Sequence, residues 1–205
     1  MKRLTFLLLF CSTLLFSQKE ISHTIGVNEQ LKTVYFTLNS VFNISLHTST
    51  KKEIIITAHS EGEYANYFAI NETRSTTTLN IDGNVDFIFP NYQDKLSAHK
   101  VHAIAVDIWV PENLQIIIQS DIGTIVASGT YQSLLIDSQS GSCFLQNIKG
   151  YITASTLSGS IVLKTNEGVV KTQTNTGVVK VSDIAKGQSR YALKTNNGNI
   201  TVKKI

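Results

Sequence analysis

The chain has 205 residues, of which 42% are hydrophobic and 16% charged, and its formal net charge is +3. Abundant Thr, Ser, Ile and Val together with only two prolines favour strands, and argue against a helical or disordered chain. The small excess of Lys and Arg gives no support to a nucleic-acid partner, which would need a clustered basic surface.

Residues 1–17 have the pattern of a secretory signal peptide. Lys2 and Arg3 precede a mostly apolar run that is too short to span a bilayer. We therefore expect an exported protein, in the periplasm, at the cell surface or extracellular, with no transmembrane segment after cleavage. Lipid anchoring at Cys11 is the less favoured alternative, because the bulky Phe10 precedes this cysteine and apolar residues follow it.

Removal of the signal peptide changes the charge and the cysteine content of the chain. The remaining residues include 16 basic and 15 acidic side chains, so the mature chain is close to neutral. Cys143 becomes the single cysteine, which excludes an intramolecular disulfide. Stability must then come from a hydrophobic core, for which the remaining length suffices in one domain or two small ones.

Residues 18–110 form an N-terminal β region, in which alternating apolar and polar residues are separated by short polar turns. This pattern predicts antiparallel strands at residues 33–38, 42–48, 52–60, 67–73 and 76–83. A polar stretch at 90–100 predicts an exposed loop, and Pro111 is expected to end the last strand of the region. We expect the region to cap the segment that follows, because an uncovered strand edge invites pairing.

Residues 111–205 carry an internal repeat. Glycine recurs every nine residues from Gly141 to Gly177, and rows of about eighteen residues, starting at 115, 133, 151, 169 and 190, place like residues in columns. Three columns are apolar throughout and alternate with polar neighbours, as in strands with one buried face. Their members are Ile116, Leu134, Ile152, Val170 and Tyr191; Ile125, Cys143, Ile161, Val179 and Ile200; and Ala127, Leu145, Leu163, Val181 and Val202.

A column of hydroxyl residues sets the length of the repeat. One hydroxyl occurs per row at the same place, whereas the place nine residues later is not uniform; the column is Ser120, Ser138, Thr156, Thr174 and Thr195. Stacked like residues indicate a parallel β-solenoid of about 18 residues per turn, for which we expect a right-handed coil. An antiparallel meander is the alternative. The glycines are expected at corners with positive φ or tight packing, and the hydroxyls are expected to form hydrogen bonds there. Lys203 and Lys204 are expected to protect the far edge.

The segment VDIWVPENLQIIIQSDIGTIVASG, followed by short steps such as STLSGSIVL, TNTGVVKV and TNNGNITV, resembles the secreted bacterial adhesin family, also described as the auto-transporter adhesin head domain. The resemblance covers residues 100–205 well and the preceding strands more loosely. It implies a parallel β-solenoid in an exported protein. Many members of the family have no established activity.

The acidic residues of the repeat do not predict a catalytic site. Enzymes that cleave polysaccharides on parallel coils need several carboxylates that converge on one face. The acids of the repeat fall in different columns: Asp121, Asp137, Glu167 and Asp183.

Metal and cofactor sites are not predicted either. His99 and His102, with Asp94 nearby, are the closest histidine pair, and two such ligands alone make a weak metal site. A calcium-binding roll would need an aspartate two places after its glycine, where this chain has apolar residues such as Ile152. Cys143 falls in an apolar column and is interpreted as a core residue.

Four aromatic residues have two interpretations. Tyr64, Tyr67, Tyr92 and Trp109 are able to stack on sugar rings, but packing in the interior of the strand-rich half is favoured. We therefore expect no catalytic, cofactor-binding or metal residues, and a non-enzymatic adhesin-like protein that binds an unknown macromolecule or glycan, or has a structural role at the envelope. A carbohydrate-active enzyme with a site at the junction of the two β regions is the alternative, and an accessory subunit in envelope signalling is a third hypothesis.

Overall fold

The computed structural model describes residues 19–61, 68–85 and 103–205. Within these residues the protein is all-β, with fifteen strands and no helix, which confirms the predicted fold class at this level. The strands are β1 (Lys19–Gly26), β2 (Thr33–Leu38), β3 (Asn43–Ser49), β4 (Glu53–Glu61), β5 (Phe68–Arg74), β6 (Thr78–Val85), β7 (Ala103–Pro111), β8 (Gln115–Ser120), β9 (Thr124–Ser140), β10 (Cys143–Ser158), β11 (Ile161–Lys164), β12 (Glu167–Thr176), β13 (Val179–Val181), β14 (Ala185–Asn197) and β15 (Ile200–Lys203).

Several predictions fall outside the described residues. They are the signal peptide at 1–17, the anchor at Cys11 and the loop at 90–100. Among the residues that are described, none belongs to an apolar helix long enough to cross a membrane.

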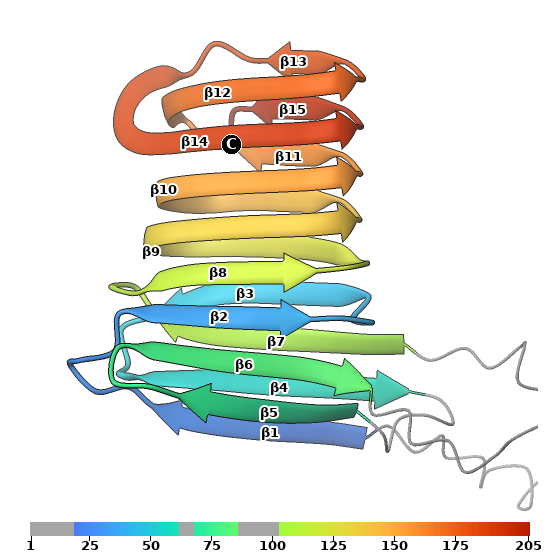
Figure 1. Ribbon diagram of the computed structural model, residues 1–205. Helices are drawn as coiled ribbons and strands as arrows, with labels where there is room; N and C mark the ends of the chain where they lie inside the picture. Colours follow the sequence, from blue (N-terminus) through green and yellow to red (C-terminus); the bar gives the residue numbers. More distant parts are fainter. Residues whose placement is uncertain (1–18, 62–67, 86–102) are drawn as a thin grey trace, which may run out of the picture.

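The strands form two ladders that face each other across the core (Figure 1). The front ladder runs in the order β5, β6, β2, β8, β9, β10, β14, β12, and the rear ladder in the order β1, β4, β7, β3, β9, β10, β11, β15, β13. β9 and β10 belong to both ladders, because each strand starts in the rear ladder and continues round a corner into the front one. One hydrophobic cluster, from Ile25 to Val202, fills the space between the ladders.

The N-terminal region is antiparallel only in part, so this prediction needs a correction. β4 pairs antiparallel with β1 and β7, and β5 with β6. β2, however, pairs parallel with β6 and β8, and β3 pairs parallel with β7 and β9. The physical reason is that β2 and β3 lie in different ladders, so the chain between them turns a corner and does not form a hairpin. β2 pairs with β8, and β3 pairs with the first residues of β9. β1 was not predicted.

In the first three rows the paired strands are offset by eighteen residues. Leu134 lies beside both Ile116 and Ile152, and Cys143 lies between Ile125 and Ile161. All of these pairings are parallel, which excludes an antiparallel meander for these rows. Of the fifteen predicted inward residues, twelve are buried, and the three that are not belong to the row that starts at residue 169.

The order of the last two rows in space is the reverse of their order in the chain. β14 lies between β10 and β12, and β15 lies between β11 and β13, so the row that starts at 190 is inserted below the row that starts at 169 (Figure 1). The expectation that Lys203 and Lys204 protect the far edge is therefore wrong, because β12 and β13 form that edge.

Burial explains this inverted order. The inserted row contributes Tyr191, Leu193 and Ile200 to the core, and all three are buried. The Tyr191 hydroxyl donates a hydrogen bond of 2.7 Å to the carbonyl oxygen of Ile148. The equivalent inward residues of the outer row, Val170 and Thr172, are smaller, so less apolar surface stays in water when that row is at the end of the stack.

The corners between the ladders are held by glycines and by hydroxyls of the predicted column, with one exception. The buried Ser138 hydroxyl has no hydrogen-bond partner within the described residues, so the prediction is wrong for this member. Gly141 has a φ of +142°, and a Cβ there would overlap the carbonyl oxygen of Gly123 in the layer below. The Thr156 and Thr195 hydroxyls donate hydrogen bonds to the carbonyl oxygens of Gly141 and Gly159, at 3.2 and 2.9 Å. These hydroxyls thus point into the corner and satisfy carbonyls that no strand partner reaches.

Candidate binding surfaces

The acids of the repeat segment lie apart and have separate roles. The Asp121 carboxylate accepts hydrogen bonds of 2.8 Å from the backbone N–H groups of Ser40 and Ile122, so it holds the corner between the N-terminal region and the first row. Asp137, Glu167 and Asp183 are exposed on three different segments.

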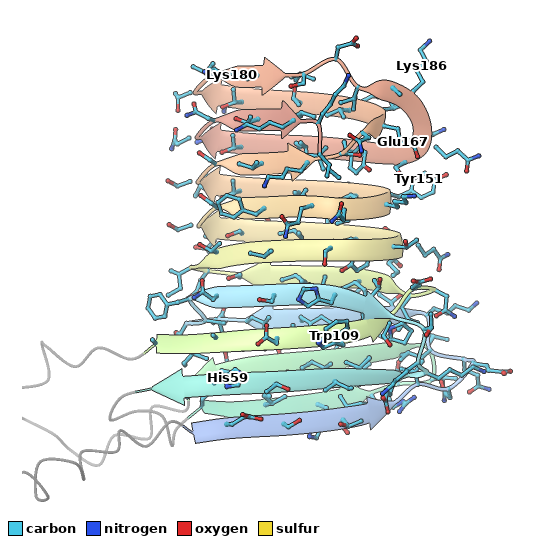
Figure 2. The ribbon with its side chains drawn as sticks, turned by 180° about the vertical axis from the view of Figure 1, so that it is seen from behind. His59, Trp109, Tyr151, Glu167, Lys180 and Lys186 are labelled. Atoms are coloured by element: carbon cyan, nitrogen blue, oxygen red, sulfur yellow. The ribbon has the colours of Figure 1, made fainter. Side chains whose placement is uncertain are left out.

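One histidine does bring two carboxylates close together. His59 Nδ1 lies 3.8 Å from Glu20, and His59 Nε2 lies 3.7 Å from Asp107. These residues lie on the outer face of the rear ladder, where Figure 2 shows His59. Within the described residues no group of three or more His, Cys, Asp or Glu is arranged to hold a metal ion. The predicted loop residues His99, His102 and Asp94 lie outside the described residues.

Cys143 is a buried core residue, as the sequence indicated. Its side chain is fully covered, and burial raises the pKa of the thiol from 9.0 to about 12. A thiol with this pKa stays neutral and is not a nucleophile at neutral pH.

We therefore expect Cys143 to resist thiol reagents. At pH 8 the native protein should react with an aromatic disulfide reagent about a thousandfold more slowly than the urea-unfolded chain, because three pKa units separate the two thiolate populations. The raised pKa also means that the native state loses stability as pH rises above 9. Fast reaction of the native protein would show that the cysteine is accessible. The reaction of the native protein with iodoacetamide, a smaller reagent, is the control, because it shows whether slow reaction is due to the size of the aromatic reagent.

Trp109 is exposed, so the favoured interpretation of this aromatic as a core residue is wrong. It is 44% exposed on the outer face of β7 (Figure 2), and its ring centroid lies 4.7 Å from that of His47. His47 Nδ1 is 2.8 Å from Ser128 Oγ. Trp109 is exposed because side chains alternate along a strand: Ile108 and Val110 point inward, so Trp109 between them points outward. Tyr64, Tyr67 and Tyr92 lie outside the described residues.

A groove of about 360 Å³ lies on the outer face of the front ladder, where β10, β14 and β12 run side by side. Tyr151 and Arg190 are adjacent in register, and the Arg190 guanidinium carbon lies 5.7 Å from the centre of the Tyr151 ring. Tyr151 is 59% exposed. The rest of the groove is lined by Val169 and Lys171 of β12 and by Thr153 and Ala192.

This groove combines an aromatic face, aliphatic walls and two cations. No carboxylate lines it. Such a surface suits stacking on a sugar ring, with Arg190 and Lys171 as hydrogen-bond donors to hydroxyl or acidic groups. Sequence analysis missed the groove, because Tyr151 and Arg190 belong to rows that become neighbours only through the inversion of the last two rows.

Charge is separated along the stack. Residues 141–205 contain nine Lys or Arg and two Asp or Glu, whereas the described residues before them, 19–61, 68–85 and 103–140, contain five basic and ten acidic residues. The ion pairs found among the described residues all lie between residues 20 and 107. The near-neutral total of the mature chain therefore conceals a basic C-terminal half whose cations have no acidic partner within the described part of the chain.

Comparison with known proteins supports the fold. No family model and no curated protein matches the chain. Among solved structures, it is similar to a candidate cell adhesion protein from Clostridium sporogenes, with a TM-score of 0.63 and 10% sequence identity over 92% of this chain and 100% of that one. A candidate adhesin from Bacteroides fragilis aligns with a TM-score of 0.39 and 16% identity, over 92% of this chain and 98% of that one.

Proposed function

We propose that this protein is an exported, non-enzymatic adhesin-like protein that binds a glycan or another macromolecule through the groove at Tyr151. The groove is the observation that carries the proposal, because it offers an exposed aromatic ring beside cations on a backbone that both neighbouring strands hold in place. The fold shared with a candidate cell adhesion protein is consistent with such a role.

The proposal includes the finer architecture and the route of the protein. We propose that residues 111–205 are a right-handed solenoid of about 18 residues per turn, of the type found in auto-transporter adhesin heads, and that residues 18–110 form its cap. The eighteen-residue offset of the paired strands supports the solenoid. We propose that residues 1–17 direct export, with the periplasm, the cell surface and the medium as destinations.

The alternative of a carbohydrate-active enzyme receives less support. A hydrolytic pair of carboxylates would lie about 5 to 10 Å apart in a groove that holds the sugar. The groove at Tyr151 has no carboxylate lining, and the two carboxylates beside His59 lie on an outer sheet face.

A glycan array probed with purified residues 18–205 tests the proposed function. We expect binding to a subset of sugars, enriched in acidic ones, and at least a tenfold weaker affinity for Tyr151→Ala, because loss of ring stacking and of the cation–π contact costs about 1.4 kcal/mol or more. Tyr35→Ala is the matched control, since Tyr35 is an exposed tyrosine on β2 of the same ladder, outside the groove. No binding on the array, or equal binding by the Tyr151 variant, would refute the role of the groove. Release of shortened sugars would instead favour the enzyme.

A further inference from the structure

The end of the stack formed by β12 and β13 has an unpaired strand edge. Each of these strands has a partner on one side only, β14 for β12 and β15 for β13, within the described part of the chain. The carbonyl of Val178 accepts a hydrogen bond from Ile200, and the amide of Ser182 donates one to Val202, each of 3.0 Å. Because backbone groups alternate in direction along a strand, Val179 and Val181 turn their N–H and C=O groups to the open edge.

The apolar interior is also open at this end. Val179 and Val181 occupy inward columns, yet they are 39% and 53% exposed. Their register partners one layer below, Ile200 and Val202, are buried. One further strand paired with β13 would cover these two valines, in the way that β13 covers Ile200 and Val202 of β15.

The opposite end of the stack is closed by polar contacts. His23 on β1 lies 3.2 Å from Glu72 on β5, and this contact joins the two ladders across the end of the core. The Arg74 guanidinium donates a hydrogen bond of 3.1 Å to the Gly26 carbonyl oxygen nearby. Such contacts protect an edge, because charged side chains at inward positions disfavour further pairing. No equivalent contact is found at the described residues of β12 and β13.

The cations around the open end favour an acidic partner. Lys180 lies outward on β13 between the two edge-facing valines, and Figure 2 shows it on the outermost layer. Lys186 lies at the start of β14, at the other side of the same view. Residues 141–205 carry nine basic and two acidic side chains. The two acids are Glu167, which begins β12, and Asp183, which follows β13, whereas Lys180 lies between the two valines of the edge.

A second copy docked through the same edge would bring two lysine-bearing edges together, which repulsion disfavours. A copy docked head to tail would have to pair this edge with the opposite end of the stack, where the contacts of His23, Glu72 and Arg74 disfavour further pairing.

We propose that the β12–β13 edge binds an extended acidic segment of a partner protein, which adds to the sheet as a further strand. Its backbone pairs with the edge-facing groups of Val179 and Val181, its apolar side chains cover these two valines, and its carboxylates lie next to Lys180. This mode of recognition takes affinity from main-chain hydrogen bonds and specificity from alternate side chains. A lipid surface explains the valines and lysines but not the edge, because hydrocarbon offers no partner to unpaired N–H and C=O groups. The site is separate from the groove at Tyr151.

The experiment measures binding of labelled heptapeptides to the full mature chain by fluorescence anisotropy. A peptide of alternating Glu and Val is expected to bind, whereas the alternating Lys and Val peptide and a polyglutamate peptide of the same length are expected to bind at least tenfold more weakly. The same Glu and Val peptide with methylated backbone nitrogens should lose binding to the unaltered protein, because it cannot donate hydrogen bonds to the edge.

Variants of the protein locate the site. Val181→Pro removes an edge-facing N–H without removing a bond to β15, and should weaken binding at least tenfold, whereas Val181→Ala keeps that N–H and should weaken it about threefold. Lys180→Glu should weaken binding by about tenfold at low salt and less at high salt. Melting temperatures and circular dichroism verify that each variant is folded. If Val181→Pro does not fold, the methylated peptide still tests the role of backbone hydrogen bonds, because it is used with the unaltered protein.

Four results would overturn the proposal. They are equal binding of the methylated peptide, equal binding of polyglutamate, a dimer in sedimentation that is lost in Val181→Pro, and binding to vesicles of anionic phospholipid without binding to the Glu and Val peptide. The third would assign the edge to a second copy of this chain, and the fourth would assign it to a membrane surface. The peptide experiments do not involve the groove at Tyr151, so a negative result for the β12–β13 edge leaves the proposed function of the groove unaffected.

Discussion

Replacement of Ile161 by Asp is expected to unfold most of the protein at room temperature. Ile161 is fully buried, between Cys143 in one neighbouring layer and Ile200 in the other. The substitution removes a packed side chain, which costs about 2–5 kcal/mol, and places a carboxylate without a partner in the core, which costs several more. Domains of this size have a total stability of about 5–15 kcal/mol, so the expected loss consumes most of it.

Thermal melts followed by circular dichroism measure this effect, with two variants on the same strand for comparison. Ile161→Val should cost about 0.5–1.5 kcal/mol, because it deletes one buried methyl group. Val162→Asp should cost about 1 kcal/mol, since Val162 points to the outer face of β11 and its substituent can reach water. A melting temperature for Ile161→Asp as high as that of Val162→Asp would contradict the inward direction of this column.

The second large effect is expected for Gly141→Ala. Gly141 has a φ of +142°, which strains any residue with a Cβ, and the new methyl group would overlap the carbonyl oxygen of Gly123. Backbone strain contributes about 1–3 kcal/mol, and relief of the overlap must push two layers apart at a corner where the Thr156 hydroxyl also bonds. We expect a total loss of about 3 kcal/mol or more.

Urea unfolding measures this loss, and the chain offers a matched control. Gly26 ends β1, and a Cβ there would meet no atom within 4 Å. Gly26→Ala should therefore change the free energy of unfolding by about 1 kcal/mol or less. If the two variants unfold at the same urea concentration, the corner packing inferred for Gly141 is incorrect.

The separation of charge along the stack links the fold to its proposed partners. Charge was assessed in the sequence as a total, and the total of the mature chain is close to zero. In the structure the described residues before position 141 and those after it occupy different parts of one stack, because the layers follow one another along one axis (Figure 1). A stack of this kind turns a gradient of charge along the chain into an electrostatic polarity of the molecule.

Strand positions were predictable from the sequence because alternation is a local property. The predicted strand at 33–38 coincides with β2, and the turn after Pro111 falls between β7 and β8 as expected. The hydroxyls of Thr156 and Thr195 bond at the glycine corners, again as predicted. Each of these features depends on residues within one row, or on the same residue type at the same place in the next row, and a sequence shows both.

The outward direction of Trp109 was also predictable from strand alternation. Ile108 and Val110 flank Trp109 on a strand of strict alternation, and both are buried. The general preference of aromatics for interiors was weighed above this local signal. Alternation decided the outcome, because a strand cannot turn three successive side chains to one face.

The sequence by itself determined the class of structure, most strand positions and which side chains of each row point inward, because burial of alternate apolar residues and the conformation of glycine act within a few residues. Only the tertiary structure decided that the row of β14 and β15 is inserted below the row of β12 and β13. The periodic pattern is the same for either order of these two rows. The order depended on the apolar surface that each row buries, which is larger for the row with Tyr191 and Ile200 than for the row with Val170 and Val179. That choice placed Arg190 beside Tyr151 and left Val179 and Val181 at an open edge, and both proposed binding surfaces depend on it.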